Sequence, residues 1–350
     1  MMHQLHLLLA HGILGQFLHI QPNRVIPSGR PKVAIIGAGA SGSAAAYFLQ
    51  DSGLDVQVFE SSDRIGGRAR VESFQVEICT ESACYLDTTL VELGASIFAK
   101  ANRQLMKVMA DFGLECNSGD SKELHASVGI WDGKHWAYLE PPNEKDSNFQ
   151  KWFGSWISKA RFLWTYGLYS PYETNKLAAT LAKSLDRIYQ WLDDGYSFAF
   201  VRKGIHELDF DESVGTSCKD WLSAKGISSS FISEFIGGFN RVTYLQEVES
   251  THAFACLVSV FSGLDETYSI KGGNNQMFEK MLMKSKVHLN TSVRSIARND
   301  GYLIEFENSA PKKFDYVVVA APLENSRIEF RNLELDIPKL PYVKLYGHIS

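Results

Sequence analysis

The strongest constraint on the fold of this chain is a glycine-rich turn between two short apolar runs. Gly37, Gly39 and Gly42 follow the run Val33–Ile36, and the run Val56–Phe59 comes after a stretch of small residues. In such a turn the first glycine permits a tight bend, the second lets the backbone approach a pyrophosphate, and the third lets a helix pack against the sheet. The order of strand, glycine turn, helix and strand predicts a dinucleotide-binding βαβ unit.

An acidic residue closes this unit. Glu60 lies eighteen positions beyond Gly42, at the end of the second apolar run. A carboxylate there accepts the ribose hydroxyls of an adenosine, while the helix N-terminus offers unpaired N–H groups to the phosphates. Ala38, Ala40 and Ser41 of the turn are further candidate cofactor contacts. The alternative, a glycine turn that binds no nucleotide, does not explain why helix, second strand and acid all follow in order.

A second glycine pair comes shortly after the acid. Gly66 and Gly67 would let the main chain run alongside a cofactor, and the fork-shaped donors of Arg68 would balance phosphate charge. The alternative is a surface turn with solvated arginines. Farther on, the small residues of Gly94–Ser96 (Gly94, Ala95 and Ser96) would let the backbone pass beside a flat ring.

These motifs resemble, in this order, the flavin-containing amine oxidase-like superfamily of FAD enzymes. Three later segments resemble its prenylcysteine oxidase (prenylcysteine lyase) branch, in forms closest to fungal members: Arg241–Tyr244, Gly272–Asn274 and His288–Val293. The resemblance runs from about Pro31 to about Pro322. Monoamine and polyamine oxidases share its first half, so the substrate assignment depends on the later segments.

The resemblance implies FAD as the cofactor, with backbone contacts from Val293 to the adenine. It also implies cleavage of farnesylcysteine or geranylgeranylcysteine to cysteine, a prenyl aldehyde and hydrogen peroxide, with molecular oxygen as acceptor, in the breakdown of prenylated proteins. No residue pattern identifies a catalytic base, and the catalytic residues stay unknown. Two alternatives remain open: an FAD-dependent amine or polyamine oxidase, and a truncated flavin-fold protein without turnover, since family members normally continue well beyond Ser350.

Four residues are the candidate substrate contacts. Arg241 would pair with the carboxylate of an amino-acid head, and Tyr244 would share its face if the segment is helical. Gly273 and Asn274 belong to the flexible turn that resembles the family. The alternative for Arg241 is a structural ion pair, and for Tyr244 a ring in the core.

The predicted fold class is α/β: a Rossmann-like FAD-binding domain with an inserted α+β substrate domain. We assign residues 31–99 and 264–330 to the discontinuous FAD-binding domain, and 100–263 and 331–350 to the substrate domain. All seven tryptophans lie between Trp131 and Trp221, where aromatic rings either line a pocket for an apolar tail or pack a helical core.

Periodicity and composition predict several further elements. Residues 102–112 read as a helix, 287–293 as a strand, and the apolar run Tyr316–Pro322 as a strand buried in a parallel sheet. With 350 residues, 45% of them hydrophobic, the chain can bury a sizeable core. Its net charge of -5, with dispersed basic residues, argues against nucleic acid as a partner.

Residues 1–30 read as a leader or an altered secretory signal. The segment Met1–Ile20 is rich in leucine but has no Lys or Arg to form a basic start. We therefore expect the lysosome, the vacuole or the secretory pathway, with a disordered leader on a cytoplasmic protein as the alternative. No stretch of eighteen uninterrupted apolar residues occurs, so we expect no transmembrane anchor.

The cysteines do not define a metal site. Cys79 and Cys84 are close enough in sequence for a small disulfide loop, whereas Cys116, Cys218 and Cys256 are scattered. The odd count leaves at least one thiol unpaired if only intrachain disulfides form. Because no Cys/His spacing suits zinc, we expect no metal. The sequence Asn290–Ser292 is a glycosylation sequon close to Val293, where a bulky glycan has little room.

Overall fold

The computed structural model describes residues 29–79, 84–118, 129–131, 135–139, 159–196, 198, 200–264 and 266–335. Nearly all of the expected leader at 1–30, and most of 331–350, lie outside the described residues. None of the described helices combines the length and the hydropathy that a membrane crossing needs.

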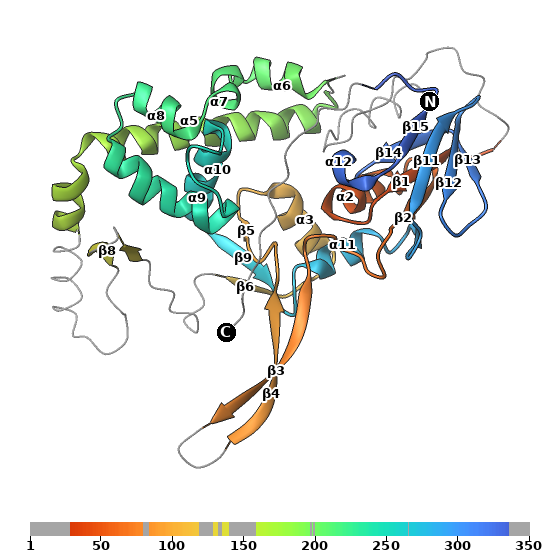
Figure 1. The fold of residues 1–350 in the computed structure, drawn as a ribbon, viewed down its shortest axis with the longest axis horizontal. Coiled ribbons are helices and arrows are strands. Elements are labelled where there is room, and N and C mark those ends of the chain that lie inside the picture. The colour runs from red at the N-terminus through yellow and green to blue at the C-terminus, as the bar shows by residue number, and fades with distance from the viewer. Residues whose placement is uncertain are drawn as a thin grey trace.

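A four-stranded parallel sheet forms the centre of the nucleotide-binding half (Figure 1). Its strands, in spatial order, are β10 (Lys286–His288), β2 (Asp55–Phe59), β1 (Lys32–Ile36) and β14 (Tyr316–Val319). Every pairing is parallel. Strands from both sides of the long helical stretch of the chain therefore meet in one sheet, and the mixed α/β fold class predicted from the sequence is confirmed.

Alternate side chains of β1 face two different layers. Val33 and Ile35 pack with residues of α2 (Ala40–Leu49) and with Leu282, just after α11 (Asn275–Met281). Ala34 and Ile36 pack against a second four-stranded sheet. Because both faces of β1 are covered, its central residues are fully buried and the strand reads as a continuous apolar run.

The second sheet lies against the parallel one (Figure 1). Its order is β13 (Lys312–Phe314), β12 (Tyr302–Phe306), β11 (Val293–Arg298) and β15 (Glu329–Arg331). The short helix α12 (Leu323–Ser326) connects β14 to β15.

A long antiparallel hairpin projects away from the rest of the described chain (Figure 1). It consists of β3 (Val71–Cys79) and β4 (Cys84–Glu92). At its base, a three-stranded antiparallel sheet has the order β5 (Phe98–Ala99), β9 (Thr267–Ile270) and β6 (Cys116–Ser118). The helix α3 (Arg103–Asp111) falls within the expected helix 102–112, and a further strand pair comprises β7 (Gly129–Trp131) and β8 (Trp136–Leu139).

The remaining helices gather in one region, apart from the two four-stranded sheets (Figure 1). After a helical stretch at 159–166, they are α5 (Tyr169–Asp193), α6 (Val201–Glu207), α7 (Asp211–Gly215), α8 (Cys218–Ala224), the π-helix η1 (Phe231–Ile236), α9 (Gly237–Tyr244) and α10 (Ala253–Leu264). In α5 the buried residues recur at helical spacing: Ser170, Thr174, Ala178 and Leu181. This single stripe joins α5 to a core shared with α8, η1 and α10.

Two strand expectations require correction. The expected strand 287–293 is two strands, β10 and β11, because Asn290 adopts a left-handed φ of +50° and turns the chain between them. The turn is held by the N–H of Thr291, which donates to the carbonyl oxygen of Glu60 at 2.7 Å. The run Tyr316–Pro322 is a strand only as far as Val319, although the N–H of Ala320 still donates to the carbonyl oxygen of Ile36 at 2.8 Å.

Four of the five cysteines are paired. The Cys79–Cys84 disulfide, which the sequence left possible, is present as a cross-strand pair near the tip of the hairpin. A second disulfide, Cys218–Cys256, joins α8 to α10, and both of its residues are fully buried. The sequence did not predict this bridge because its 38-residue separation carries no local signal. Cys116 is the free cysteine.

We expect the two disulfides to differ in their effect on stability. Cross-linking restricts the unfolded chain more when the closed loop is longer, so the Cys218–Cys256 pair should contribute about 4 kcal/mol and the Cys79–Cys84 pair about 2 kcal/mol. Denaturant unfolding of the two double Cys→Ala variants measures the difference. An equal loss of unfolding free energy in both variants would contradict this assignment, and thiol labelling of the unfolded wild-type chain should find one free thiol.

Candidate functional site

The turn after β1 contains a contact that only glycine allows. A Cβ atom on Gly42 would lie 1.9 Å from the carbonyl oxygen of Gly37. Gly37 has a φ of +107°, and its N–H donates to the carbonyl oxygen of Phe59 at 2.8 Å. Gly39 is the N-cap of α2. The turn therefore brings the first N–H groups of α2, which have no acceptor within the helix, to the carboxyl edge of the parallel sheet.

Glu60 is fixed at this edge by hydrogen bonds to its carboxylate. The N–H of Ala38 donates to Oε2 at 2.8 Å, and the N–H and the hydroxyl of Ser62 donate to Oε1 at 2.9 and 2.8 Å. The Ser61 hydroxyl adds a longer bond of 3.3 Å. Oε2 accepts one bond and has further lone-pair capacity, so these bonds orient the group and leave this oxygen available as an acceptor.

The same contacts decide the charge of Glu60. Burial is the largest single influence and would raise the pKa of this carboxyl, but the hydrogen bonds from Ala38, Ser62 and Ser61 together outweigh it and lower the pKa below the ordinary value of 4.5. Glu60 is therefore an ionised acceptor at neutral pH.

The second glycine element runs directly beside the first. The N–H of Gly66 donates to the carbonyl oxygen of Ala38 at 2.9 Å, and Gly39 and Gly66 form a parallel bridge. Gly67 has a φ of +58°. Its Cα would be the nearest atom, at 3.8 Å, to a Cβ atom on Gly39. Arg68 follows, with an exposed side chain at the rim of the cleft described next.

A cleft of about 420 Å³ opens along these segments. Its size lies within the range of roughly 300–1,000 Å³ that is usual for small-molecule and cofactor sites. Most of the predicted cofactor-binding residues line it: Gly37, Gly39, Ala40, Ser41, Glu60, Gly66, Gly67, Arg68, Ala95 and Val293. Their contact with a cofactor stays a prediction. The other four, Ala38, Gly42, Gly94 and Ser96, lie in the same segments next to lining residues.

Several lining residues were not anticipated from the sequence. They are Phe59, Phe278, Thr291, Ser292, Ala320, Ala321, Pro322, Ser326 and Ile328, among others. Ala320–Pro322 had a usable signal, because β14 pairs in parallel with β1 and the residues after both strands must meet at one edge. Phe278 had none, since α11 reaches the cleft only through tertiary packing.

The four residues predicted to contact the substrate fall into two groups. Asn274 is 2% exposed and its side-chain amide donates to the carbonyl oxygen of Ala95 at 2.7 Å. A Cβ atom on the preceding Gly273 would lie 2.4 Å from the Val71 side chain, so the backbone is tightly packed there. Asn274 contacts the Gly94–Ser96 segment, and neither Asn274 nor Gly273 is among the residues that line the cleft.

Arg241 and Tyr244 form the second group. Both lie in α9, so the segment is helical, which is the condition for the two side chains to share a face. Nη1 of Arg241 donates to Glu247 Oε2 at 2.9 Å in an exposed ion pair. Burial raises the pKa of the Tyr244 hydroxyl. None of the described cleft-lining residues belongs to α9, so this pair stays a prediction for a separate part of a substrate site.

The aromatic residues of the helical region divide between core and surface. Phe162 and Tyr166 pack edge-on against each other and against Phe231. Trp164 and Tyr172, by contrast, are 93% and 68% exposed. Core packing therefore describes the first set of rings, and a wall for an apolar ligand stays a prediction for the exposed ones.

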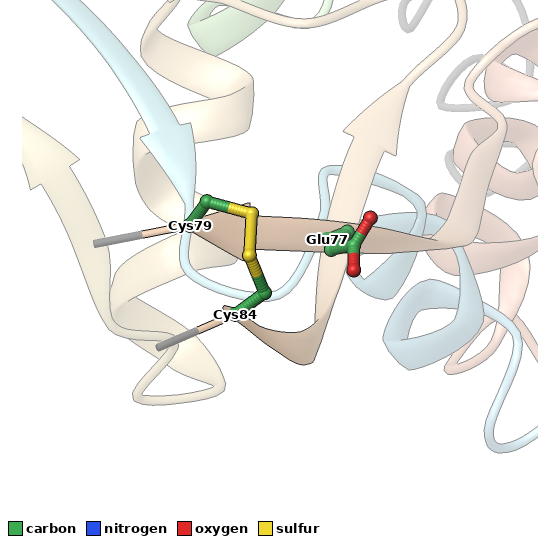
Figure 2. A group of neighbouring side chains, drawn as sticks. All are labelled: Glu77, Cys79 and Cys84. Atoms are coloured by element: carbon green, nitrogen blue, oxygen red, sulfur yellow. A yellow bond between two sulfur atoms is a disulfide. The ribbon is translucent and has the colours of Figure 1, made fainter. Parts of the chain in front are cut away.

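One group of metal-ligating side chains occurs among the described residues. Glu77, Cys79 and Cys84 lie on the same face of the hairpin, with ligand atoms within 4.8 Å of one another (Figure 2). The two sulfur atoms are bonded to each other, so neither offers the thiolate that binds a metal. This cluster gives no support for a metal site in the oxidised chain.

Comparisons with known proteins agree with this architecture. The family pattern described as prenylcysteine lyase matches residues 149–349, and the pattern described as an NAD(P)-binding Rossmann-like domain matches residues 35–112. Prenylcysteine oxidase 1 of Bos taurus is 27% identical over 338 residues, 91% of this chain and 61% of the relative. Farnesylcysteine lyase of Arabidopsis thaliana is 26% identical over 317 residues, 88% of this chain and 60% of the relative.

A solved structure shares the fold. Wild-type putrescine oxidase bound to putrescine has a TM-score of 0.52 and 21% identity, covering 87% of this chain and 61% of the other. At that identity the likeness concerns the fold alone. The chain spans about three fifths of the length of the curated relatives cited above. Since the prenylcysteine lyase pattern covers more than half of its residues, the chain belongs to the prenylcysteine lyase family.

Proposed function

We propose that this chain binds FAD in the cleft at the carboxyl edge of the parallel sheet and takes part in the oxidative cleavage of prenylcysteine. The observation that carries the proposal is the cleft itself, where a glycine turn, an ionised acid and a second glycine pair meet in a member of this family. The names of the bovine and Arabidopsis relatives both refer to prenylated cysteine.

The second glycine pair favours FAD over a nicotinamide cofactor. Gly66 and Gly67 extend the backbone wall beyond the first glycine turn, and Arg68 adds a cation at the rim. A pyrophosphate between the N-terminus of α2 and Arg68 would receive both N–H donors and a guanidinium. Glu60 would then accept the adenosine ribose hydroxyls.

The bound flavin would supply hydride acceptance, and the protein would supply position and control of water. Loss of hydride from the carbon next to sulfur leaves a cation that sulfur and the allylic double bond stabilise. Addition of water and cleavage of the carbon–sulfur bond then release free cysteine and a prenyl aldehyde. The overall balance is prenylcysteine, oxygen and water in, and cysteine, prenyl aldehyde and hydrogen peroxide out.

The amino-acid head of the substrate fits best beside Arg241. In the free chain its guanidinium pairs with Glu247 in a half-exposed setting, where an ion pair contributes little and exchanges readily. A substrate carboxylate would compete for the same donors. Tyr244, on the same face of α9, would orient the head.

An amine oxidase is the second candidate, because the fold is shared with putrescine oxidase. That likeness does not distinguish the two activities. The family pattern covers the helical region and β9 to β15, and this favours the thioether substrate. The third candidate is a chain that binds flavin but does not turn over a substrate.

The disulfides favour an oxidising compartment. Cys218–Cys256 is fully buried and Cys79–Cys84 is exposed, and such bridges persist in the secretory pathway or the lysosome and vacuole rather than in the cytosol. These bridges support our proposal that the protein resides there in preference to the cytoplasm.

Replacing Glu60 by Gln should weaken FAD binding roughly tenfold or more, because a charged acceptor for the ribose is lost while shape is kept. Fluorescence titration of the apoprotein with FAD measures the effect. Glu305→Gln is the matched control, since this carboxylate accepts from Ser295 and Arg331 in the second sheet and does not line the cleft. Unchanged FAD affinity in the Glu60 variant would show the ribose assignment to be wrong.

The charge of Glu60 also predicts a pH dependence of stability. Its pKa is lower in the folded chain than in the unfolded one, so its stabilising contribution is fully present above the ordinary value of 4.5 and is lost as pH falls through the folded pKa. The loss of unfolding free energy caused by Glu60→Gln should therefore shrink as pH falls from 7 towards 3. Denaturant unfolding of both chains at each pH measures it. A constant difference across this range would contradict the assigned charge.

Purified chain should release hydrogen peroxide with farnesylcysteine and not with spermine or putrescine. Arg241→Ala should raise the KM for farnesylcysteine roughly tenfold, as expected for the loss of a charged hydrogen bond. Lys219→Ala, which removes a similarly exposed ion pair with Glu249, is the control and should leave KM unchanged. Peroxide release with amines alone would identify an amine oxidase, and bound flavin with no turnover would point to a non-catalytic chain.

A further inference from the structure

Asn274 connects two segments that are far apart in the sequence, one at 92–95 and the other at 270–274. Its backbone N–H donates to Glu92 Oε1 at 2.6 Å, at the end of β4. Its side-chain Nδ2 donates to the carbonyl oxygen of Ala95 at 2.7 Å, and its Oδ1 accepts from the N–H of Ile270 in β9 at 2.7 Å. With 2% of its surface exposed, its amide is committed to these partners rather than to solvent.

Both joined segments lead into the wall of the cofactor cleft. Ala95 lines the cleft, and Phe278 reaches it from α11, the helix that Asn274 caps. The neighbouring Gly94 is pressed against the Arg68 segment, where an added Cβ atom would lie 1.9 Å from the Arg68 carbonyl oxygen. A shift of Ala95 would therefore move the backbone at Arg68, which lines the cleft.

Glu92 has an unusual place in this network. Oε1 accepts the bond from Asn274, whereas Oε2 is buried and has no hydrogen-bond partner within the described part of the chain. A buried carboxylate oxygen without a donor costs free energy. Local costs of this kind are expected at functional sites, where a group is kept for what it positions rather than for stability.

We propose that Asn274 and Glu92 are positioning residues that hold the backbone at Ala95 and the start of α11 at the spacing a bound flavin ring requires. The proposal rests on the proposed binding of FAD. It gives Asn274 a different task from substrate contact: its amide sets the shape of the cleft from behind the wall. Glu92 fixes the backbone of Asn274, so the two act as a pair.

The pair can be tested with isosteric variants. Asn274→Asp keeps the volume and the acceptor for Ile270 but replaces the donor to Ala95 by an oxygen. Asn240→Asp is the matched control, because Asn240 is also fully buried and its Nδ2 donates to the Gln246 carbonyl oxygen and the Thr251 hydroxyl, in the helical region. Tm, FAD affinity and the visible absorbance spectrum of the bound flavin are measured for each.

Both variants should lower Tm, but only Asn274→Asp should weaken FAD binding, by about tenfold, and shift the flavin absorbance bands. Glu92→Gln, which keeps an acceptor for Asn274 and is expected to fold, should shift the bands in the same direction with a smaller loss of affinity. These variants remain informative if Asn274→Asp itself does not fold.

Two results would overturn the inference in distinguishable ways. Failure of the wild-type chain to bind FAD would remove the proposed cofactor and the inference with it. Normal binding by the wild type, with flavin affinity and spectrum in Asn274→Asp and Glu92→Gln equal to those of Asn240→Asp, would leave the cofactor in place and remove the positioning role alone.

Discussion

The contact between Gly42 and the carbonyl oxygen of Gly37 is the constraint on which the cofactor end of the molecule depends. With 1.9 Å between that oxygen and the position of a Cβ atom, no side chain fits at residue 42. The missing side chain lets α2 begin directly over the end of β1. The first N–H groups of the helix, the carboxyl edge of the sheet and the acid at the end of β2 then come within one cleft.

Hydrogen bonds to this turn fix the positions of the neighbouring segments. Ala38, inside the turn, donates to Glu60 and accepts from Gly66. One residue thus aligns the acid with the second glycine element. The turn at Asn290 is aligned in the same way, because the N–H of Thr291 donates to the Glu60 carbonyl oxygen. Four of the segments that line the cleft therefore have a common backbone reference, which keeps this part of its shape defined before any ligand enters.

The helical region is stabilised by different means. Its core is aromatic and aliphatic, α5 contributes a single buried stripe, and the buried Cys218–Cys256 bridge ties α8 to α10. Large rings such as Trp164 remain exposed beside this core. The cleft is thus shaped by backbone hydrogen bonds, whereas the helical region is stabilised by side-chain packing and a disulfide.

The sequence by itself determined the local parts of the site. Glycine spacing, the apolar runs and the terminal acid act over short distances in the chain, so β1, the turn, α2, β2 and the position of Glu60 followed directly from residue order. The helix at α3 was equally local, and the short spacing of Cys79 and Cys84 made their bridge possible without deciding it. Tertiary structure alone decided the rest: the Cys218–Cys256 bridge, Phe278 in the cleft wall, the break between β10 and β11, and the burial of Asn274 against Glu92. These features depend on which distant segments pack together, and no short-range pattern of residues encodes that choice.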